Sequence, residues 1–582
     1  MKQTSLNNGE ASRKRTVILN TIIIFSFVAV FFRLSDIMIL KNRYYTEKAK
    51  SQQVKTEDIQ ARRGNIYDRK GREIAINLEM ESLYCDPEEA GATPENIKKL
   101  SSILNVEPKA IKAKLTQEKR FVWVDRKLSL ETSERVKKLK MKGFGFMSEA
   151  KRFYPRGSLA SHIVGAVGRE NQPLEGIELK YDRYLRTPGS KVQVARDASG
   201  RVLSTGMAME SKGNDIILTI DEGLQYIAEK EVVKAMLKWH SVAATAIMMD
   251  PFTGEILALA SRPAFDPNDI MKAGRSDVRN RAITDIYEPG STFKIVAGTA
   301  AIEEKLFPAG QTFDCSRGSI EVGGKNIKDA HKHGVITFEE VIQKSSNVGT
   351  IMIGMRLGKE RLYDYAKRFG FGDRTNIDLP GEVSGWIRKP EKWSATSLGA
   401  IPIGQEVAVT PLQVLRAYAA IANGGYLVQP HLVSQIRTPE GQPVFSFSPD
   451  QKKRIISERT AAVMRDILKT VVEEGGTATS AAIDGNKVAG KTGTAQLVDQ
   501  RTKRYSKDRF ISSFVGFVPA DNPKIAMIVV VHEPKGAIYG GVVAAPVFKA
   551  VADQALSYMD VPRDGNPGQN LLLVSSQTST SR

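Results

Sequence analysis

The stretch "EPGSTFK" (288–294) places a hydroxyl and an amine three positions apart, directly after a turn. A Pro-Gly pair ends one segment and can open another. The run that follows, "STFKIVAGTAAIEEKL" (291–306), favours a helix. Side chains at positions i and i+3 share a helix face, so Ser291 and Lys294 are predicted to point the same way near a helix N-terminus.

This pair could form a serine nucleophile with its own base. A serine hydroxyl needs a base, and a lysine can serve only if its pKa falls from about 10.4 towards neutrality. Burial and a nearby cation can lower it by up to about 3–5 units. The pattern alone is common, because a second copy, Ser148-Glu149-Ala150-Lys151, lies in a charged stretch with no turn before it. The hypothesis therefore depends on the rest of the chain.

Composition limits the function classes. The chain has 582 residues, which suggests about three or four domains, and it is 41% hydrophobic and 26% charged, as globular proteins are. Its net charge of +19 suits anionic surroundings such as phospholipid headgroups or nucleic acid. The basic residues are scattered and no nucleic-acid-binding motif is recognisable, so we predict no nucleic-acid partner.

Cysteine and histidine usage gives no sign of a cofactor. Cys85 and Cys315 are 230 positions apart and are predicted to be unpaired thiols. No His-Glu-x-x-His occurs, and "HKH" (331–333) is interpreted as a solvated basic loop rather than a metal site. We predict neither metal nor cofactor.

The N-terminus predicts a membrane anchor. The apolar stretch 17–32 extends to Leu40, which gives 24 residues where a membrane-spanning helix needs about 20. No Ala-x-Ala-like site follows it, which favours an uncleaved anchor over a cleaved signal peptide. We therefore predict a cytoplasmic tail at 1–15 and a transmembrane anchor at 16–40. The flanking basic residues do not settle its orientation.

The composition and the predicted secondary structure of the chain change near residue 213. Residues 41–212 are charged and rich in Gly and Pro, and they predict an elongated, non-catalytic, loop-rich region. In 213–560, strand patterns at both ends surround a mainly helical middle. This order predicts an α+β domain whose antiparallel sheet joins the two ends. The final stretch, 561–582, is rich in Gly, Ser and Asn and is predicted to be disordered.

Two further motifs follow "STFK" in order. "KSSNVG" contains Ser345, 51 residues beyond Lys294, and also Asn347. "GKTGTAQ" contains Lys491, which lies 144 residues beyond Asn347. The second motif contains Lys491, Thr492, Gly493 and Thr494. The trio resembles the set S-x-x-K, S-x-N, K-T-G of the penicillin-recognising serine enzymes.

The resemblance extends over nearly the whole chain. Signatures similar to those of class B penicillin-binding proteins occur at "RGNIYDRKG" (63–71), "RFYP" (152–155), "GIE" with "YD" (176–182), "LTID" with "LQ" (218–225) and "GQEVAVTPLQ" (404–413). The family usually has Asn where Lys70 stands. The segment "YGGVVAAPVFKAVADQAL" (539–556) and the short N-terminal region look most like the division-specific FtsI type. The sporulation type is similar too.

The resemblance implies a fold and a reaction. The fold is a penicillin-recognising transpeptidase domain, 213–560, on a pedestal of the dimerisation type, 41–212, with one transmembrane helix. The reaction is attack of Ser291 on the D-Ala-D-Ala end of a peptidoglycan stem peptide, with Lys294 as base. The resemblance also implies roles for the other motif residues. Ser345 would transfer a proton, Asn347 would hold the substrate, and Lys491 would lower the pKa of Lys294 while keeping its own charge. Thr492 and Thr494 would bind the terminal carboxylate, and Gly493 would let the strand approach the substrate closely.

The resemblance also implies partners and a location. These are β-lactams, a SEDS-family glycan polymerase and other divisome membrane proteins, with the chain in the cell (inner) membrane and its catalytic domain on the periplasmic or extracytoplasmic side. A β-lactamase is a second interpretation, although no Glu-x-x-Leu-Asn motif lies between Asn347 and Lys491. A non-catalytic β-lactam sensor and a DNA-associated membrane protein are a third and a fourth. Division and elongation roles are not separated by the sequence.

Overall fold

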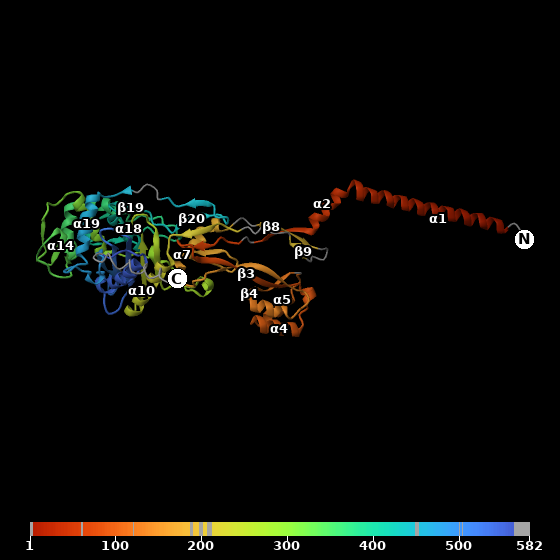
Figure 1. The fold of residues 1–582 in the computed structure, drawn as a ribbon, viewed down its shortest axis with the longest axis horizontal. Helices are drawn as coiled ribbons and strands as arrows, with labels where there is room; N and C mark the ends of the chain where they lie inside the picture. Colours follow the sequence, from red (N-terminus) through yellow and green to blue (C-terminus); the bar gives the residue numbers. More distant parts are fainter. Residues whose placement is uncertain are drawn as a thin grey trace, which may run out of the picture. The chain divides into compact units, whose positions relative to one another are not determined.

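The structure is a computed structural model (Figure 1). It describes residues 4–59, 62–119, 121–186, 190–196, 202–205, 212–448, 453–499, 501–502 and 504–563. The chain separates into two compact units, the first formed by 1–62 with 187–212 and the second by 63–186 with 213–582. The predicted disordered tail lies outside the described residues from position 564 onward.

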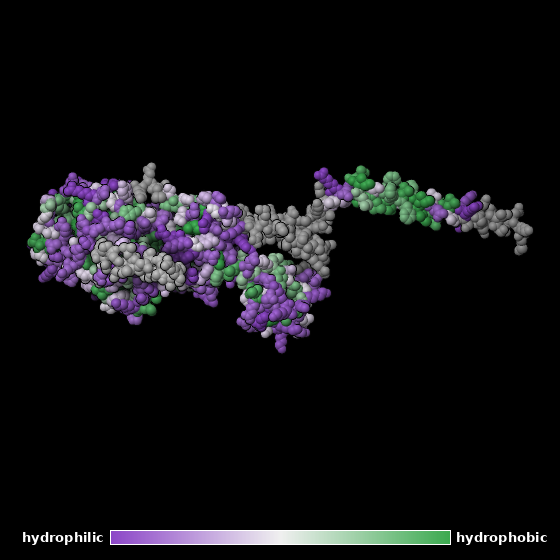
Figure 2. Space-filling model, viewed as in Figure 1, coloured by the Kyte–Doolittle hydropathy of each residue, from purple (hydrophilic) through white to green (hydrophobic). Residues whose placement is uncertain are grey.

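The first unit contains a long apolar helix. Helix α1 (Thr4–Ser35) continues through the π-helical turn η1 (Asp36–Leu40). Within the described part of the chain, Arg13–Leu40 is the one helical stretch long and apolar enough to cross a membrane, and Figure 2 shows its exposed hydrophobic surface. Near its end Asp36 accepts hydrogen bonds from Arg33 (3.1 Å) and Lys41 (2.9 Å), so the carboxylate is paired.

A helix and a small sheet complete the first unit. Helix α2 (Asn42–Gln53) leads into β1 (Val54–Ile59). Strand β1 pairs antiparallel with β8 (Ser190–Arg196), and β8 pairs antiparallel with β9 (Val202–Thr205). The strands that join the two ends of this unit are therefore about 130 residues apart in the sequence.

The pedestal is built on a seven-stranded sheet of order β21-β20-β10-β2-β3-β4, with β5 also paired to β3. Its strands are β2 (Ile66–Tyr67), β3 (Glu73–Cys85), β4 (Val122–Leu128), β5 (Phe144–Phe153), β10 (Asp215–Leu218), β20 (Val433–Arg437) and β21 (Pro443–Ser446). Helices α4 (Pro94–Leu104), α5 (Pro108–Leu115) and α6 (Leu130–Lys137) bury Leu100, Ile111 and Val136 in a small core beside it. Strands β10, β20 and β21 come from the range predicted as catalytic domain, so the two parts share one sheet.

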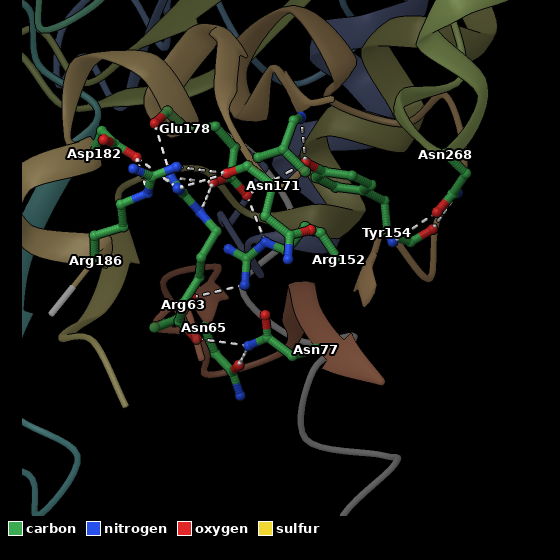
Figure 3. A network of polar contacts seen from close by, with 12 residues as sticks. Arg63, Asn65, Asn77, Arg152, Tyr154, Asn171, Glu178, Asp182, Arg186 and Asn268 are labelled. Atoms are coloured by element: carbon green, nitrogen blue, oxygen red, sulfur yellow. Dashed lines mark hydrogen bonds and ion pairs between the residues drawn. The ribbon is translucent and has the colours of Figure 1, made fainter. Parts of the chain in front are cut away.

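Three of the sequence signatures meet at one buried carboxylate (Figure 3). Glu178, on α8 (Gly176–Lys180), is fully buried and accepts hydrogen bonds from Arg63 (2.9 Å) and Arg152 (2.6 Å). The Tyr154 hydroxyl also donates to it at 3.3 Å, and Arg63 pairs with Asp182 as well. Segments more than 100 residues apart are thus held together by a paired charge network.

The catalytic domain is organised around a five-stranded antiparallel sheet of order β12-β11-β25-β24-β23. The strands are β11 (Ala243–Met249), β12 (Ile256–Arg262), β23 (Ala489–Val498), β24 (Tyr505–Val518) and β25 (Ile525–His532). The predicted α+β fold, with strands from both ends of the domain in one antiparallel sheet, is confirmed.

Helices cover both faces of this sheet. On β11, Ala244, Ala246 and Met248 pack with α10 (Glu222–Trp239) and α21 (Ala545–Tyr558) on one face. Ile247 and Met249 belong to the larger core on the other face. That core contains α13 (Lys294–Glu303), α14 (Phe338–Gln343), α15 (Asn347–Leu357), α16 (Lys359–Arg368), α18 (Pro411–Ala422) and α19 (Glu458–Thr470). Because both faces are buried, the central strands are almost continuously apolar.

Short elements connect these layers. They are α3 (Pro87–Ala90), α7 (Ser161–Val164), β6 (Ala166–Val167), β7 (Pro173–Glu175), α9 (Asp182–Leu185), η2 (Pro267–Lys272), α11 (Arg275–Val278), α12 (Arg281–Thr284), η3 (Gly290–Phe293), β13 (Thr312–Asp314), β14 (Ser319–Val322), β15 (Lys325–Lys328), β16 (Val335–Thr337), β17 (Trp386–Ile387), η4 (Pro390–Lys392), α17 (Ser397–Ala400), η5 (Ile401–Ile403), β18 (Val407–Ala408), β19 (Tyr426–Leu427), β22 (Lys453–Arg454), η6 (Thr479–Ala481) and α20 (Gly540–Val543).

Candidate active site

Ser291 lies in the 3₁₀ turn η3, and the α-helix α13 begins only at Lys294. The helix was predicted to start at Ser291. The difference arises because Gly290 has a left-handed φ of 55° and the chain tightens before it becomes α-helical, as is frequent at helix N-termini. Residues i and i+3 still align in a 3₁₀ turn, so Ser291 and Lys294 lie on one side.

The second Ser-x-x-Lys copy has a different structure. Ser148 and Lys151 lie on strand β5, where residues three positions apart point to opposite faces of the sheet. The copy therefore cannot pair a hydroxyl with an amine. Turn chemistry before the motif was the signal that separated the two copies in the sequence.

Lys294 is completely buried and makes contact with the second motif. Its Nζ donates to the Ser345 carbonyl at 2.6 Å, to the Ser345 hydroxyl at 3.2 Å and to Asn347 Oδ1 at 2.9 Å. Burial lowers the pKa of Lys294 from 10.5 to about 7, while the carboxylate of Asp329 acts to raise it. The amine is thus poised to exchange protons near neutral pH.

The loop that carries Ser345 and Asn347 is held in a defined conformation. Ser345 has a left-handed φ of 57°, and Ser346 caps helix α15 by accepting a hydrogen bond from the Gly349 N–H at 3.0 Å. Asn347 donates through Nδ2 to the Lys328 carbonyl at 2.8 Å. Its side-chain oxygen is therefore fixed towards Lys294.

Asp329 is a site residue that sequence reasoning missed. Its carboxylate accepts hydrogen bonds from the backbone N–H groups of Asn347 and Val348 (3.1 Å for Val348) and from the Ser346 hydroxyl at 3.0 Å. A carboxylate at the N-terminus of α15 satisfies the unpaired N–H groups there. Asp329 positions the whole Ser345–Asn347 loop, and no spacing rule in "NIKDAHKH" (326–333) marks it.

Strand β23 brings the third motif to the same place. Thr492 shares a hydroxyl–hydroxyl hydrogen bond with Thr477 at 3.0 Å, and Thr494 Oγ1 accepts from the Gly540 N–H at 3.2 Å. A Cβ on Gly493 would lie 2.4 Å from the Ser513 hydroxyl and 2.9 Å from the Thr292 methyl group. Gly493 is therefore required by packing against β24 and the Ser291 turn, in addition to any approach of substrate.

The electrostatics of the two lysines differ from the sequence expectation. Lys491 was expected to keep its charge while only Lys294 lost it. Burial instead lowers the pKa of both amines, and that of Lys491 falls well below 10.5, with the nearby Lys294 cation as a further cause. The reason is that Lys491 Nζ lies near only a carbonyl, that of Thr492 at 3.5 Å, and among the described residues it has no carboxylate to offset its burial.

A cavity of about 1000 Å³ opens over these groups. Five of the predicted residues line it, namely Ser291, Ser345, Asn347, Thr492 and Thr494. Lys294 and Lys491 are fully buried and do not line it, and Gly493 packs against Ser513 of β24 and against Thr292. The cavity is also lined by residues to which the sequence assigned no role in the site, among them Glu288, Lys344, Gln405, Phe510 and Tyr539, and by His331 and His333 of the basic loop.

Comparison with known proteins gives concordant results. Residues 244–553 match the penicillin binding protein transpeptidase domain, and residues 58–218 match the penicillin-binding protein dimerisation domain. Stage V sporulation protein D of Bacillus subtilis is 35% identical over 560 residues, covering 94% of this chain and 86% of that protein. Peptidoglycan D,D-transpeptidase FtsI of Escherichia coli is 30% identical over 521 residues, covering 88% of this chain and 86% of its own length.

A solved structure agrees in fold. The crystal structure of penicillin binding protein 3 from Mycobacterium tuberculosis in complex with aztreonam has a TM-score of 0.68 and 29% identity, covering 87% of this chain and 98% of that one.

Proposed function

The chain belongs to the penicillin-binding protein transpeptidase family, and from this premise we propose that it is a membrane-anchored peptidoglycan D,D-transpeptidase that crosslinks stem peptides in septal wall synthesis during cell division. The observation that carries the proposal is the buried amine of Lys294, which lies beside the Ser291 turn and contacts both Ser345 and Asn347. We also propose that 41–212 form the pedestal, that 213–560 form the transpeptidase domain, and that the site residues act in the following way.

The first half of the reaction forms an acyl-enzyme. The neutral Lys294 amine takes the proton of Ser291, whose Oγ attacks the carbonyl between the two D-alanines. The oxyanion is held by the backbone N–H groups of Ser291 and Thr494, and one such donor contributes about 2.7–4 kcal/mol. The proton passes through Ser345 to the departing amine, D-Ala leaves, and an ester on Ser291 remains.

The substrate is held by its carboxylate and its backbone. Thr492 and Thr494 donate hydroxyl hydrogen bonds to the terminal carboxylate, and Lys491 gains a proton when this carboxylate arrives and supplies the opposite charge. Asn347 binds a substrate amide while it positions Lys294.

The second half transfers the acyl group to an acceptor amine. The ammonium group of a neighbouring stem peptide gives one proton to Lys294, and the free amine attacks the ester carbonyl. The bond to Ser291 breaks, the second amine proton goes to its Oγ, and Lys294 releases the first proton to solvent and is neutral again. The product is an amide crosslink, and transfer to water in place of an amine would give a D,D-carboxypeptidase side reaction.

The anchor and partners follow from the family. The apolar helix Arg13–Leu40 supports a single-pass protein in the cell (inner) membrane, and peptidoglycan chemistry requires the catalytic domain on its outer, periplasmic or extracytoplasmic side. A SEDS-family glycan polymerase would supply the strands to be crosslinked, together with other divisome membrane proteins.

Acylation is the direct test of the enzyme. Incubation with benzylpenicillin should add one adduct to the intact mass, mapped to Ser291 and absent from Ser291→Ala. The adduct should persist over hours, whereas rapid turnover would indicate a β-lactamase. An adduct retained in Ser291→Ala would refute the assignment of the nucleophile.

The septal role has its own test. Depletion of the protein in the parent cell should give filaments with blocked septa. Loss of rod shape would assign it to elongation, and a defect confined to spores would assign it to the sporulation type that the Bacillus subtilis relative's name describes.

A further inference from the structure

Glu288 lies at the rim of the catalytic cavity in a rigid position. It precedes the nucleophile by three positions, and both it and Ser291 line the cavity. The backbone of Tyr287 exchanges hydrogen bonds with Val409 at 3.0 and 2.9 Å, and the Gly290 N–H donates to the Gly404 carbonyl at 3.1 Å. The chain on either side of Glu288 is thus fixed.

The carboxylate of Glu288 is oriented by uncharged donors. The Tyr505 hydroxyl lies 3.1 Å from Oε1 and 2.9 Å from Oε2, and the Glu406 backbone N–H donates to Oε1 at 3.0 Å. Within the described residues, no lysine or arginine lies within salt-bridge distance, and Lys325 acts on it only from further away. Burial raises the pKa of Glu288, which means that the carboxylate is incompletely compensated.

The neighbouring carboxylate provides a contrast. Glu406 is paired with Arg388 and also accepts a hydrogen bond from the Ser397 hydroxyl at 2.7 Å. The charge of Glu406 is therefore compensated by an arginine, and Glu406 does not line the cavity. Glu288 has no such cation in the described part of the chain, and it is the sole acidic residue among the described residues that line the cavity.

Elsewhere the cavity is lined by basic residues and has no second acidic one among the described residues. His331, His333 and Lys344 line it on the side of Ser345. A substrate carboxylate is therefore attracted to one part of the cavity, and a substrate cation is attracted to the part that Glu288 occupies.

We propose that the Glu288 carboxylate binds the ammonium group of the acceptor peptide and so directs the acyl-enzyme towards amines and away from water. This rests on the proposed transpeptidase function, because only that reaction brings a cationic second substrate to Ser291. Glu288 acts after acylation and has no part in the attack of Ser291 on the donor.

The experiment separates the two halves of the reaction. A thioester of an N-acyl-D-alanine, which has no amino group, serves as donor. The acceptors are D-alaninamide, a cation at neutral pH, and hydroxylamine, which is uncharged. We expect Glu288→Gln to reduce the ratio of aminolysis to hydrolysis about tenfold with D-alaninamide, since a charge-assisted hydrogen bond becomes a neutral one. The ratio with hydroxylamine should stay within about twofold, as should the rate of acylation by the thioester.

Two controls separate loss of acceptor binding from loss of folding and from a general effect of charge. Glutamine keeps the shared oxygen that Tyr505 and the Glu406 N–H contact, so the acylation rate reports whether the fold is intact. Glu339→Gln removes an exposed charge on α14, outside the cavity, and should leave all the ratios unchanged. Equal losses with both acceptors, or no loss, would overturn the proposal. So would reduced acylation confined to donors that carry a free amine, because the ammonium bound would then belong to the donor.

A different result would refute the proposed transpeptidase function itself. If the unmodified chain forms no acyl-enzyme on Ser291 from the thioester or from benzylpenicillin, the transpeptidase assignment is refuted before the acceptor is tested.

Discussion

Two buried clusters of ionisable groups in this chain differ in whether their cations are paired with carboxylates. Around Glu178, in the pedestal, the cations Arg63 and Arg152 are matched by carboxylates with direct hydrogen bonds. Around Lys294 and Lys491, in the catalytic domain, two amines are buried without a salt bridge to any described carboxylate.

The difference shows what each cluster does. A matched network fixes segments that are distant in the sequence, and it loses stability if one partner is removed. Amines that have no paired carboxylate are costly to bury, and the cost appears as lowered pKa values. Burial brings the pKa of Lys294 to about 7, which turns an inert ammonium into a base near neutral pH. The matched cluster is thus expected to control folding and the unmatched one to control the rate.

The largest effect is expected from Lys294→Arg. Guanidinium keeps the positive charge but cannot lose its proton near neutral pH, so the base is removed. We expect the second-order rate of acylation by benzylpenicillin to fall at least about 10³-fold, within the range of general base catalysis. The thermal midpoint serves as the control for folding. A near-normal rate would show that Lys294 is not the base.

Glu178→Gln should break the matched cluster. It leaves Arg63 and Arg152 buried with too little negative charge, which is expected to cost about 3 kcal/mol of the free energy of unfolding. Urea denaturation measures this, and the acylation rate per folded molecule should not change. Glu255→Gln is the matched control, because its pair with Arg69 is partly exposed and is expected to contribute less than about 1 kcal/mol. Equal costs for the two variants would contradict the comparison.

The two clusters were also unequally predictable from sequence. Ser291, Lys294, Ser345, Asn347 and the Lys491–Thr494 strand each lie in a short linear motif, and the structure brings the three motifs together. The spacing within each motif sets the side-chain direction, whereas the meeting of the three motifs was implied by the family resemblance.

The missed features depend on contacts between distant segments. Glu178 belongs to a recognised signature, yet nothing local indicates that it meets Arg63 from 115 positions away. The pairing of β20 with β10 joins residues more than 200 positions apart, and both strands are short. Asp329 contacts the loop of Ser346 largely through backbone N–H groups. Almost any residue type supplies such a group, so the sequence does not reveal the contact.

Asp329→Asn should have an intermediate effect and a diagnostic pH dependence. Asparagine can still accept hydrogen bonds from the N–H groups of Asn347 and Val348, so a loss of about tenfold in the acylation rate is expected from the weaker, uncharged contacts. The carboxylate favours the ammonium form of Lys294, so its removal lowers the pKa of that amine further. The rising limb of the acylation rate, which requires neutral Lys294, should therefore move to lower pH. A limb that stays in place would show that Asp329 does not act on Lys294, and one that moves to higher pH would contradict the sign of its effect.

The smallest displacement of that limb is expected from Lys491→Gln. From the sequence alone, neutralising Lys491 would be expected to raise the pKa of Lys294 and move the limb to higher pH. The structure changes this expectation, because the pKa of Lys491 is lowered well below that of an ordinary lysine, partly by Lys294 itself. The lowered pKa of Lys294, about 7, arises from burial, with Asp329 acting against it, and Lys491 is not among its causes.

Replacing Lys491 is therefore expected to leave both causes of the Lys294 shift, burial and the Asp329 carboxylate, in place. The limb should therefore stay nearly in place in Lys491→Gln, while the acylation rate falls, since no cation can form to meet the carboxylate of the β-lactam. The measurement is the acylation rate from about pH 5 to about pH 10 for this variant, Asp329→Asn and the unmodified chain. If Lys491→Gln moves the limb clearly to higher pH, Lys491 is charged in the free enzyme and lowers the pKa of Lys294, as the sequence alone suggests.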